Sequence, residues 1–213
     1  MRRDWGEYRM IKKERAIIFT GESVRGILSG SKTQTRRVIK WRKDPENGSW
    51  IKSIHADGGG NWVAWSSDEP GLADFTKKAY PNGEGFRCPY GKPRDLLYVK
   101  ETWAPIEGLI LYRADAHKPF ETDGPWKSSR FMPRKFSRIT LEITDIRIQR
   151  LQEITEADAR DEGVDARVAG QDEYGRIMTY RTGFVYLWEK INGKKFPWIM
   201  NPWVFVISFR RVQ

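Results

Sequence analysis

The sequence predicts an α+β fold, a small β-barrel with flanking helices and two long insertions. Short runs of apolar or alternating residues indicate strands, and segments with helical periodicity lie between them. Within residues 138–151 the alternation changes parity between Ile143 and Ile146, which indicates a bulge or sharp bend of the kind that closes a small barrel. The expected barrel strands span residues 16–20, 33–39, 95–101, 138–149 and 203–210.

The first elements lead into the segment Gly30–Arg37, which reads GSKTQTRR. Residues 1–15 are charged and aperiodic, and we expect them to be poorly ordered or to lie against a partner. A buried strand at 16–20 precedes a short amphipathic helix with apolar residues at positions 24, 27 and 28, which the glycine ends. The spacing of Thr33 and Thr35 then predicts a strand that places both threonines and Arg37 on one face, with Lys32 at its mouth.

Residues 41–87 form a predicted insertion, which we interpret as a flap over the barrel mouth. The segment is polar, rich in Gly and Asp, and interrupted by three prolines, and a loop of this length is usually functional or disordered. Within it, 50–54 and 62–65 alternate enough to form a hairpin around a glycine triplet. Trp62 and Trp65 are therefore either stacking residues for a base or anchors that pin the flap to the core.

Residues 88–132 combine a turn, a barrel strand and the second insertion. Cys88–Arg94 holds two prolines and a glycine, so it predicts a turn before the strand at Asp95–Glu101, which has one apolar and one mixed face. The second insertion is expected to hold a strand at Leu109–Arg113 and a loop through Met132.

Two helices and a core strand complete the expected fold. Thr155–Asp158 is a capping-box sequence that begins a helix running to Gly163. Apolar residues at i, i+3, i+4 and i+7 predict an amphipathic helix over Gly183–Ile191, ended by Asn192-Gly193. The alternation in Trp203–Arg210 predicts a core strand.

Length and charge point to one basic domain. The chain has 213 residues with no repeat or low-complexity linker, so we predict a single domain over 1–213. It carries 38 Lys and Arg against 28 Asp and Glu, a formal charge of +10, which is typical of a protein that binds a phosphate backbone. Ten Trp, eight Tyr and ten Phe could supply stacking platforms for bases, although many must belong to the core.

Cysteine and histidine usage predicts no metal and no cofactor. Cys88 is the only cysteine, which excludes an internal disulfide and a cysteine-based metal cage and favours a cytoplasmic protein. His55 and His117 are too few and too far apart in sequence to suggest a zinc site. The amino-terminal residues lack the apolar core of a signal peptide, and no run approaches the length of a membrane span, so we expect no membrane partner.

Three residues could carry acyl transfer or hydrolysis. Thr35 is a possible hydroxyl nucleophile, and Lys32 could act as its base or electrostatic partner if desolvation lowers the pKa of the lysine. Glu162 is predicted at the end of a helix, where the helix dipole disfavours a carboxylate and raises its proton affinity. The alternatives are a solvated strand edge for Lys32 and Thr35, and an ordinary exposed acid for Glu162.

The helix, the pattern G-x-K-T-x-T-x-R and the later strand and acidic helix resemble the ASCH domain, named for activating signal cointegrator homology. This domain is a relative of the PUA-like RNA-binding barrels. Residues 88–103, 132–163 and 184–212 also look like the longer ASCH proteins often carried by phages and prophages. The resemblance implies a PUA-like barrel, in which the strand at 95–101 lies next to the Lys-Thr strand.

The smallest ASCH proteins are bacterial amidohydrolases that remove the acetyl group from acetylcytidine. Their proposed catalytic set, transferred by motif, implies catalytic roles for Lys32, Thr35 and Glu162. We also expect five substrate-binding residues in the same pocket, with an aromatic ring to stack on a planar base. These are Thr33, Arg37, Tyr98, Glu101 and Trp103.

The resemblance leaves two functions from different classes. One is a hydrolase that acts on acetylcytidine-like nucleosides; the other is a module that binds RNA, or a modified base in DNA, without chemistry. This chain is about twice as long as the minimal enzyme, and its basic excess and extra aromatic residues favour a polymeric ligand. A ribonuclease is a further alternative, although the sequence lacks the histidine pair usual for that chemistry.

Overall fold

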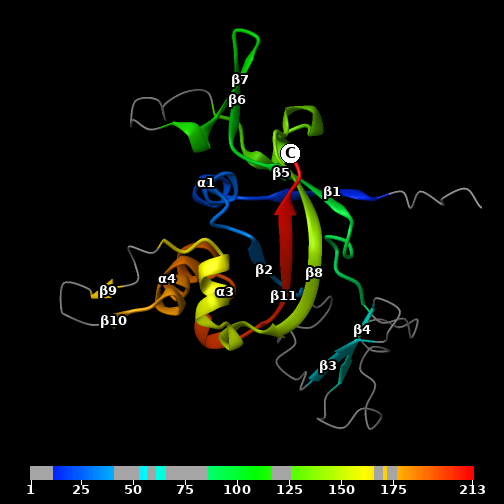
Figure 1. Ribbon diagram of the computed structural model, residues 1–213, viewed down its shortest axis with the longest axis vertical. Helices are drawn as coiled ribbons and strands as arrows, with labels where there is room; N and C mark the ends of the chain where they lie inside the picture. The colour runs from blue at the N-terminus through cyan, green and yellow to red at the C-terminus, as the bar shows by residue number, and fades with distance from the viewer. Residues whose placement is uncertain are drawn as a thin grey trace, which may run out of the picture.

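The computed structural model describes residues 12–40, 53–56, 61–65, 86–116, 126–165, 170–171 and 177–213. A five-stranded mixed sheet forms its centre (Figure 1). β1 runs parallel to β5, and the remaining neighbours are antiparallel. The strands, in their order across the sheet, are β1 (Glu14–Ile18), β5 (Leu96–Lys100), β8 (Thr140–Arg150), β11 (Trp203–Arg211) and β2 (Gln34–Val38).

The predicted α+β class is confirmed, whereas a closed barrel is not observed in the described part of the chain. There the hydrogen-bonded ladder ends at β1 on one side and at β2 on the other. A side chain, instead of the backbone, joins these two edges, because the Arg37 guanidinium donates to the Ile18 carbonyl at 2.7 Å. β1 also begins earlier than the predicted Ala16, since Glu14 and Arg15 pair with β5.

The bulge predicted from the parity change in β8 is confirmed by the register. Ser208 of β11 lies opposite Asp145, while the next residue, Phe209, lies opposite Ile143. Thr144 therefore has no partner in this ladder, which is the arrangement of a β-bulge. Because of this extra residue, Ile143 before the bulge and Ile146 after it pack on the same face of the sheet.

Local capping sets the bounds of three α-helices, α1 (Gly21–Ser29), α3 (Glu156–Asp161) and α4 (Tyr180–Asn192). Gly30 ends α1 with φ of 79°, a backbone conformation that favours glycine. The predicted capping box is present at α3, where Thr155 and Asp158 bond to each other's backbone N–H. α4 begins three residues before the predicted Gly183 because Thr179 caps it.

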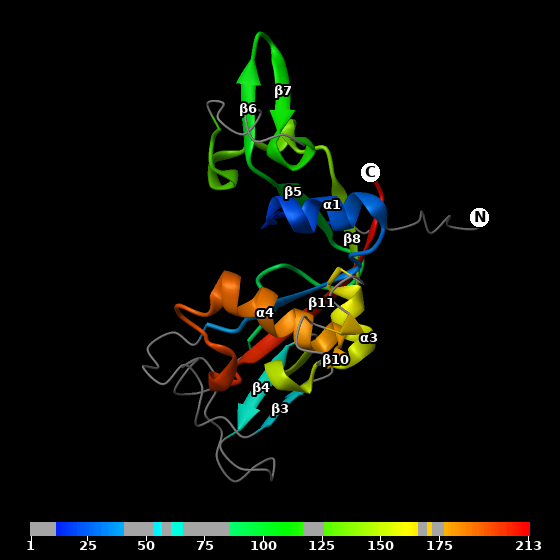
Figure 2. The same cartoon turned by 90° about the vertical axis from the view of Figure 1, so that its left-hand side faces the viewer.

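Two hydrophobic clusters lie on opposite faces of β11. Phe205, Ile207 and Phe209 point into the larger cluster, which is shared with β1, β5, β8 and α1. Val204 and Val206 point into a smaller cluster, which α3 and α4 cover. Figure 2 shows α3 and α4 close together, with α1 above them.

Three two-stranded hairpins extend from this body. The predicted hairpin in the first insertion is confirmed as β3 (Ser53–Ala56) and β4 (Trp62–Trp65), and the predicted strand at 109–113 is confirmed as β7. The others are β6 (Trp103–Ile106) with β7 (Leu109–Tyr112), and β9 (Gly170–Gln171) with β10 (Ile177–Met178). Within the described ranges the short 3-10 helices are η1 (Arg113–Asp115), η3 (Ser129–Phe131), η4 (Arg134–Phe136), η5 (Leu151–Glu153) and η7 (Trp198–Met200).

Trp62 serves as an anchor for the first insertion. Its ring lies 5.7 Å from that of Phe205 in edge-on contact and 6.3 Å from that of Phe86. It therefore packs against the core, as one of the two sequence interpretations expected. The side chain of Trp65 and most of 41–87 lie outside the described residues, as do residues 1–11. None of the helices in the described ranges is long and apolar enough to span a bilayer.

Candidate functional site

Lys32 occupies a slot between the end of α1 and the end of α3. Its backbone N–H donates to the Gly26 carbonyl at 3.0 Å, and it forms an isolated antiparallel bridge with Glu162. Gly163 has φ of 79°, and a Cβ added there would lie 2.9 Å from the Cβ of Lys32. Gly163 therefore both turns the chain and leaves room for the lysine side chain.

The Lys32 ammonium is buried against Glu162. Its Nζ donates to the Glu162 carboxylate at 2.8 Å and to the Glu162 backbone carbonyl at 2.6 Å. The two side chains are only 4% and 5% exposed, and the ammonium also lies over the Phe19 ring at 5.8 Å. Burial lowers the pKa of Lys32, and the adjacent carboxylate opposes this shift. The proton on Lys32 is thus held less tightly than on an exposed lysine.

Arg36 supplies a second cation to the same carboxylate. Its NH1 donates to Glu162 at 3.1 Å and to the Gln34 amide oxygen at 2.8 Å, and its NH2 lies 3.2 Å from Asp158. Asp158 in turn pairs with Arg147. Burial lowers the pKa of Arg36, which the two carboxylates counter, but a guanidinium stays charged at neutral pH. Glu162 is therefore shared by two buried cations.

Lys32, Thr35 and Glu162 line one cavity of about 490 Å³. Thr35 is buried, and its hydroxyl has no hydrogen-bond partner among the residues that the structure describes. The sequence prediction that these three side chains share a concave pocket is thus met by the geometry. Their catalytic roles remain a prediction.

Arg37 lies on the same face of β2 as Thr35, as the alternation predicted. Its guanidinium is stacked 5.1 Å from the Phe19 ring and 5.9 Å from the Tyr90 ring. Burial lowers its pKa as well. Its buried Nε forms no hydrogen bond within the described ranges, so a donor remains available beside the cavity.

The cavity is cationic and has aromatic walls. Six Lys and Arg residues and a single acidic residue, Glu162, line it. A positive cavity of this kind attracts anions and retains its field because few carboxylates neutralise it. Its cationic residues are Lys32, Arg36, Arg37, Lys40, Lys194 and Lys195, and its aromatic residues are Phe19, Tyr90, Phe184, Trp188 and Phe196.

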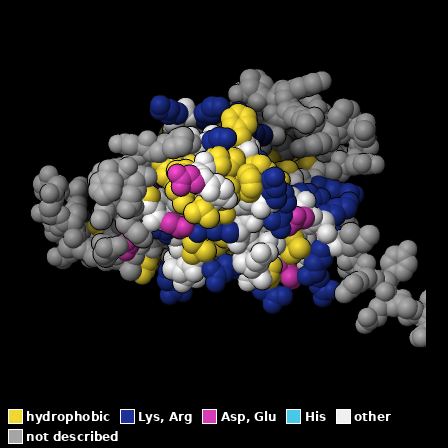
Figure 3. All heavy atoms as spheres, turned by 90° about the horizontal axis from the view of Figure 1, so that it is seen from above, with side chains coloured by type: hydrophobic (Ala, Val, Ile, Leu, Met, Phe, Trp, Pro, Cys, Tyr) yellow, Lys and Arg dark blue, Asp and Glu magenta, His cyan; other side chains and the backbone are white. Residues whose placement is uncertain are grey.

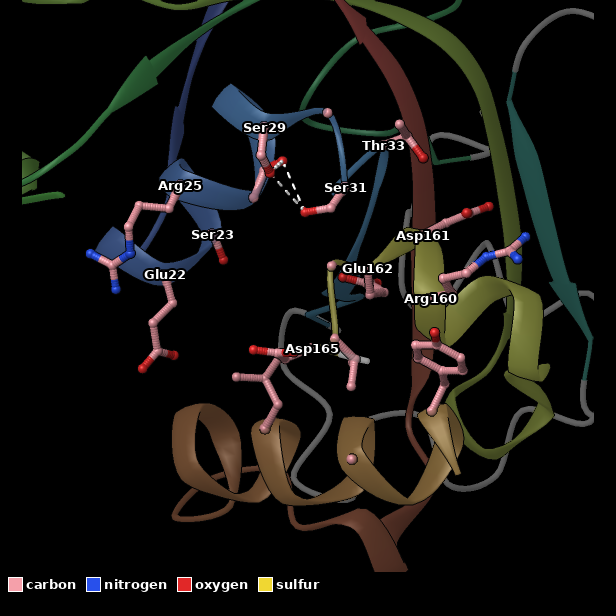
Figure 4. Close-up of a pocket in the computed structure, with 17 residues that line it drawn as sticks. Glu22, Ser23, Arg25, Ser29, Ser31, Thr33, Arg160, Asp161, Glu162 and Asp165 are labelled. Carbon is pink, nitrogen blue, oxygen red and sulfur yellow. Dashed lines mark hydrogen bonds between the residues drawn. The ribbon is translucent and has the colours of Figure 1, made fainter. Parts of the chain in front are cut away.

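A wider cavity of about 950 Å³ lies on the other side of Glu162, between α1, α3 and α4 (Figure 4). The figure shows Ser23, Ser29 and Ser31 on the α1 side of this cavity, and Asp161 and Glu162 on the α3 side. Thr33 is exposed and lines this wider cavity instead of the one that holds Thr35. Glu162 therefore lines both cavities and separates one from the other.

Three of the predicted substrate-binding residues lie elsewhere. Tyr98 is on the outer face of β5, under the Arg134 guanidinium. Glu101 is buried against Arg138, and Trp103 begins a strand of its own and packs on Phe136. None of these three lines the cavity, so the expectation that Tyr98 or Trp103 stacks on a base there is wrong. The side chain of Tyr98 lies on the opposite face of β5 from the buried Leu97 and Val99, which is why it does not reach the site. β5 also pairs with β1 and β8, so the expectation that it lies next to the Lys-Thr strand is wrong.

The aromatic residues that do line the cavity escaped the sequence interpretation. Phe19 follows β1 directly, Tyr90 lies in the turn before β5, and Phe184 is on the apolar stripe of α4. Arg36 was also missed, because strand alternation placed it opposite Thr35 and Arg37. The acidic residues at the end of α3 could have indicated the role of Arg36. Buried carboxylates need cationic partners, and Arg36 lies on the face of β2 that meets α3.

Cys88 and the histidines add no chemistry to the cavity. Burial raises the pKa of the Cys88 thiol to about 11, so it is protonated at neutral pH. His55 is an exposed residue of β3, and His117 lies outside the described residues. Within the described ranges no three His, Cys, Asp or Glu side chains gather in a way that could hold a metal ion.

Comparisons with known proteins leave the site to be interpreted from its own geometry. No protein-family model matches the sequence, and no curated protein matches it. A solved structure, protein EF3133 from Enterococcus faecalis V583, described with the family model DUF984, is similar with a TM-score of 0.37 and 10% identity. That alignment covers 95% of this chain and 82% of the other.

Proposed function

We propose that the protein binds a nucleic acid or modified nucleobase in the Thr35 cavity and removes an acyl group from the exocyclic nitrogen of an acetylcytidine-like base. The observation that carries this proposal is the buried Lys32–Glu162 pair beside a Thr35 hydroxyl without a partner. The resemblance of the Lys32, Thr35 and Glu162 motif to ASCH amidohydrolases points to the same reaction. Under this proposal the fold is a PUA-like variant whose barrel is incompletely closed.

The lining of the cavity supports a nucleotide ligand. The half-buried ring of Tyr90 offers a surface for a planar base, and stacking of this kind is tolerant of base identity. Arg37, Lys194 and Lys195 are suited to phosphate oxygens. The volume of about 490 Å³ lies within the range of roughly 300–1,000 Å³ that small-molecule sites occupy.

The proposed reaction begins with attack of the Thr35 oxygen on the acyl carbonyl carbon. The hydroxyl proton passes to the neutral amine of Lys32, the form that burial favours by lowering the pKa of this lysine. The bond between the carbonyl carbon and the cytosine nitrogen then breaks, and Lys32 returns the proton to the departing amine. Water hydrolyses the threonine ester, again through Lys32, and releases the carboxylic acid.

Glu162 and Arg37 have supporting roles in this scheme. Glu162 accepts hydrogen bonds from Lys32 and so fixes the direction of its nitrogen while the proton moves. Arg37 carries an unused Nε–H, which can donate to a carbonyl oxygen of the base or to the oxyanion. Glu162 is therefore a positioning residue, whereas Thr35 and Lys32 act on the reacting atoms.

Binding without turnover is the alternative, and the pairing of Lys32 with Glu162 favours it. The two short hydrogen bonds from Lys32 to Glu162 stabilise the ammonium form, which cannot accept a proton. A protein in which this form dominates would hold the same base through the same residues without cleaving it. The two functions therefore differ in the protonation state of a single side chain.

The test is to incubate the protein with acetylcytidine and, separately, with unmodified RNA, and to measure released acetate and strand breaks. We expect acetate release that Thr35→Val abolishes and that Thr144→Val, on the exposed bulge of β8, leaves intact. Binding of acetylcytidine without acetate release would support the binding module. Strand breaks in RNA would instead support a ribonuclease.

A further inference from the structure

The segment of residues 126–138, between the second insertion and β8, is strongly basic. It reads WKSSRFMPRKFSR and contains five Lys or Arg residues and no acidic residue, so its charge cannot be neutralised from within. Arg134 and Arg138 pair with acidic residues elsewhere in the chain. Lys127, Arg130 and Lys135 are exposed and form no ion pair with any residue that the structure describes.

The segment is fixed to the body near both ends and at its centre, although several of the side chains between these points face solvent. Met132 is buried, and its sulfur accepts a hydrogen bond from the Glu101 N–H at 3.3 Å. The Ser137 hydroxyl donates to the Val99 carbonyl at 2.8 Å. Phe131, next to the buried Met132, is 72% exposed. A large ring held outward by a rigid backbone is preorganised for contact with a partner.

Charge and aromatic content indicate what that partner is. Platforms for single-stranded nucleic acids combine aromatic rings that stack on bases with cations that follow the phosphate backbone. Figure 3, which views the molecule from the β6–β7 end, shows hydrophobic side chains interspersed with Lys and Arg and with fewer acidic side chains. A protein partner that docked on apolar area alone would not need this excess of unpaired cations.

The segment is physically continuous with the Thr35 cavity. The Lys100 ammonium donates to the Arg130 carbonyl, which brings the end of β5 against η3. Lys100 lies opposite Ile18 in the β1–β5 ladder, and Ile18 lines the cavity while its carbonyl binds Arg37. A single-stranded nucleic acid that leaves the cavity past Ile18 would therefore meet Lys100 and then the basic segment.

We infer that Lys127, Arg130, Phe131 and Lys135 form a platform that binds the strand next to the target base of a single-stranded nucleic acid. Phe131 stacks on one base, and the three cations contact phosphates. This inference rests on the proposed nucleic-acid recognition in the cavity, and it deepens it by selecting a polymer over a free nucleoside as the preferred ligand.

The test compares binding of a fluorescein-labelled single-stranded 12-mer, as RNA and as DNA of the same sequence, with binding of a trinucleotide. Phe131→Ala is expected to weaken 12-mer binding on the order of tenfold, because one base loses its stacking partner. The double variant Arg130→Gln, Lys135→Gln should reduce the slope of log K against log salt by about 1.4 for a single strand. Tyr186→Ala, at an exposed aromatic of α4, and Lys92→Gln, at the opposite end of β5 from Lys100, are the matched controls.

The outcomes separate this inference from the proposed function. The platform variants should bind the trinucleotide and hydrolyse acetylcytidine as the unmodified protein does, which also shows that they are folded. If the 12-mer binds no more tightly than the trinucleotide, or if the controls weaken it as much as Phe131→Ala, the inference is overturned while hydrolysis stands. If the platform variants weaken 12-mer binding but the unmodified protein releases no acetate from acetylcytidine, the platform stands and the amidohydrolase proposal fails.

Discussion

Glu162 and Glu101 are both buried carboxylates paired with arginine, but only Glu162 faces a cavity. Glu101 is 1% exposed and accepts two hydrogen bonds from Arg138, at 2.9 and 3.1 Å. Arg138 directs its remaining donors to Asp115, at 2.7 and 2.9 Å, and stacks 3.9 Å from the Tyr112 ring. This network joins the β6–β7 hairpin to the sheet, and Glu101 lines neither of the two cavities described above.

The environment of Glu162 differs because this residue lines two cavities. Its two cations come from different elements, Lys32 before β2 and Arg36 within it. The Thr35 hydroxyl and the Nε of Arg37 lack partners in the described part of the chain, and both belong to residues that line the cavity. Burial and pairing of a carboxylate are therefore not sufficient to indicate a functional site; an adjoining cavity lined by polar groups is the better sign.

The largest expected effect is on stability, from the removal of each carboxylate charge. Glu162→Gln leaves Lys32 and part of Arg36 buried without full compensation, which should lower the free energy of unfolding by about 3–5 kcal/mol. Glu101→Gln should cost less, about 1–2 kcal/mol, because Arg138 keeps Asp115 and is partly exposed. Urea denaturation of the two variants measures the difference. Equal losses would show that the cavity does not distinguish the two carboxylates.

The second prediction concerns rate. Lys32→Met keeps an unbranched side chain in the slot but removes the base, so acetate release should fall by roughly 100-fold or more. Arg138→Lys weakens the other network and destabilises the protein, but the rate per folded molecule should not change. If the Lys32→Met protein keeps its rate of acetate release, a group other than Lys32 must act as the base.

The third prediction compares alanine substitutions at two glycines, of which only one lies against Lys32. Gly30 and Gly163 both have φ of 79°, so alanine at either position should cost about 1–2 kcal/mol from the left-handed conformation. Only at Gly163 would the new Cβ also meet Lys32, since nothing lies within 4 Å of a Cβ at Gly30. Gly163→Ala should therefore lose acetate release as well as stability, whereas Gly30→Ala should lose stability alone. Urea denaturation and acetate assays of both variants check this.

Much of the fold could be predicted because its signals are local. The Thr155 capping box, the glycine that ends α1 and the parity change at the Thr144 bulge each depend on a few adjacent residues. The convergence of Lys32, Thr35 and Glu162 could be proposed only through the family resemblance, since no local pattern links residues 130 positions apart.

The errors concern residues whose surroundings depend on distant pairing. Tyr98 and Trp103 are aromatic and near a strand end, but whether they face the cavity depends on the order of strands across the sheet. Trp103 also begins β6, which the following proline made unlike a strand in the sequence. Arg36 was missed because the alternating pattern of β2 separates its two faces but does not show that helices cover both of them.

The smallest expected effect is a difference in pH dependence between the two networks. Burial lowers the pKa of Lys32 and raises that of Glu101, because desolvation disfavours the charged form of either group. Between the lowered pKa of Lys32 and its ordinary value of 10.5, the folded protein binds fewer protons than the unfolded chain. The contribution of Lys32 to stability is therefore present above pH 10.5 and is lost as pH falls through its folded pKa.

Glu101 should show the opposite slope. Between 4.5 and its raised pKa the folded protein binds more protons than the unfolded chain, so its contribution is present below pH 4.5 and is lost as pH rises through the folded value. The measurement is the difference in unfolding free energy between the unmodified protein and Lys32→Met in the alkaline range, and Glu101→Gln in the acidic range. The acetate-release rate should rise with pH through the lowered Lys32 pKa, because only the neutral amine accepts the threonine proton. A rate that is independent of pH up to 10.5 would remove Lys32 as the base and require another group in that role.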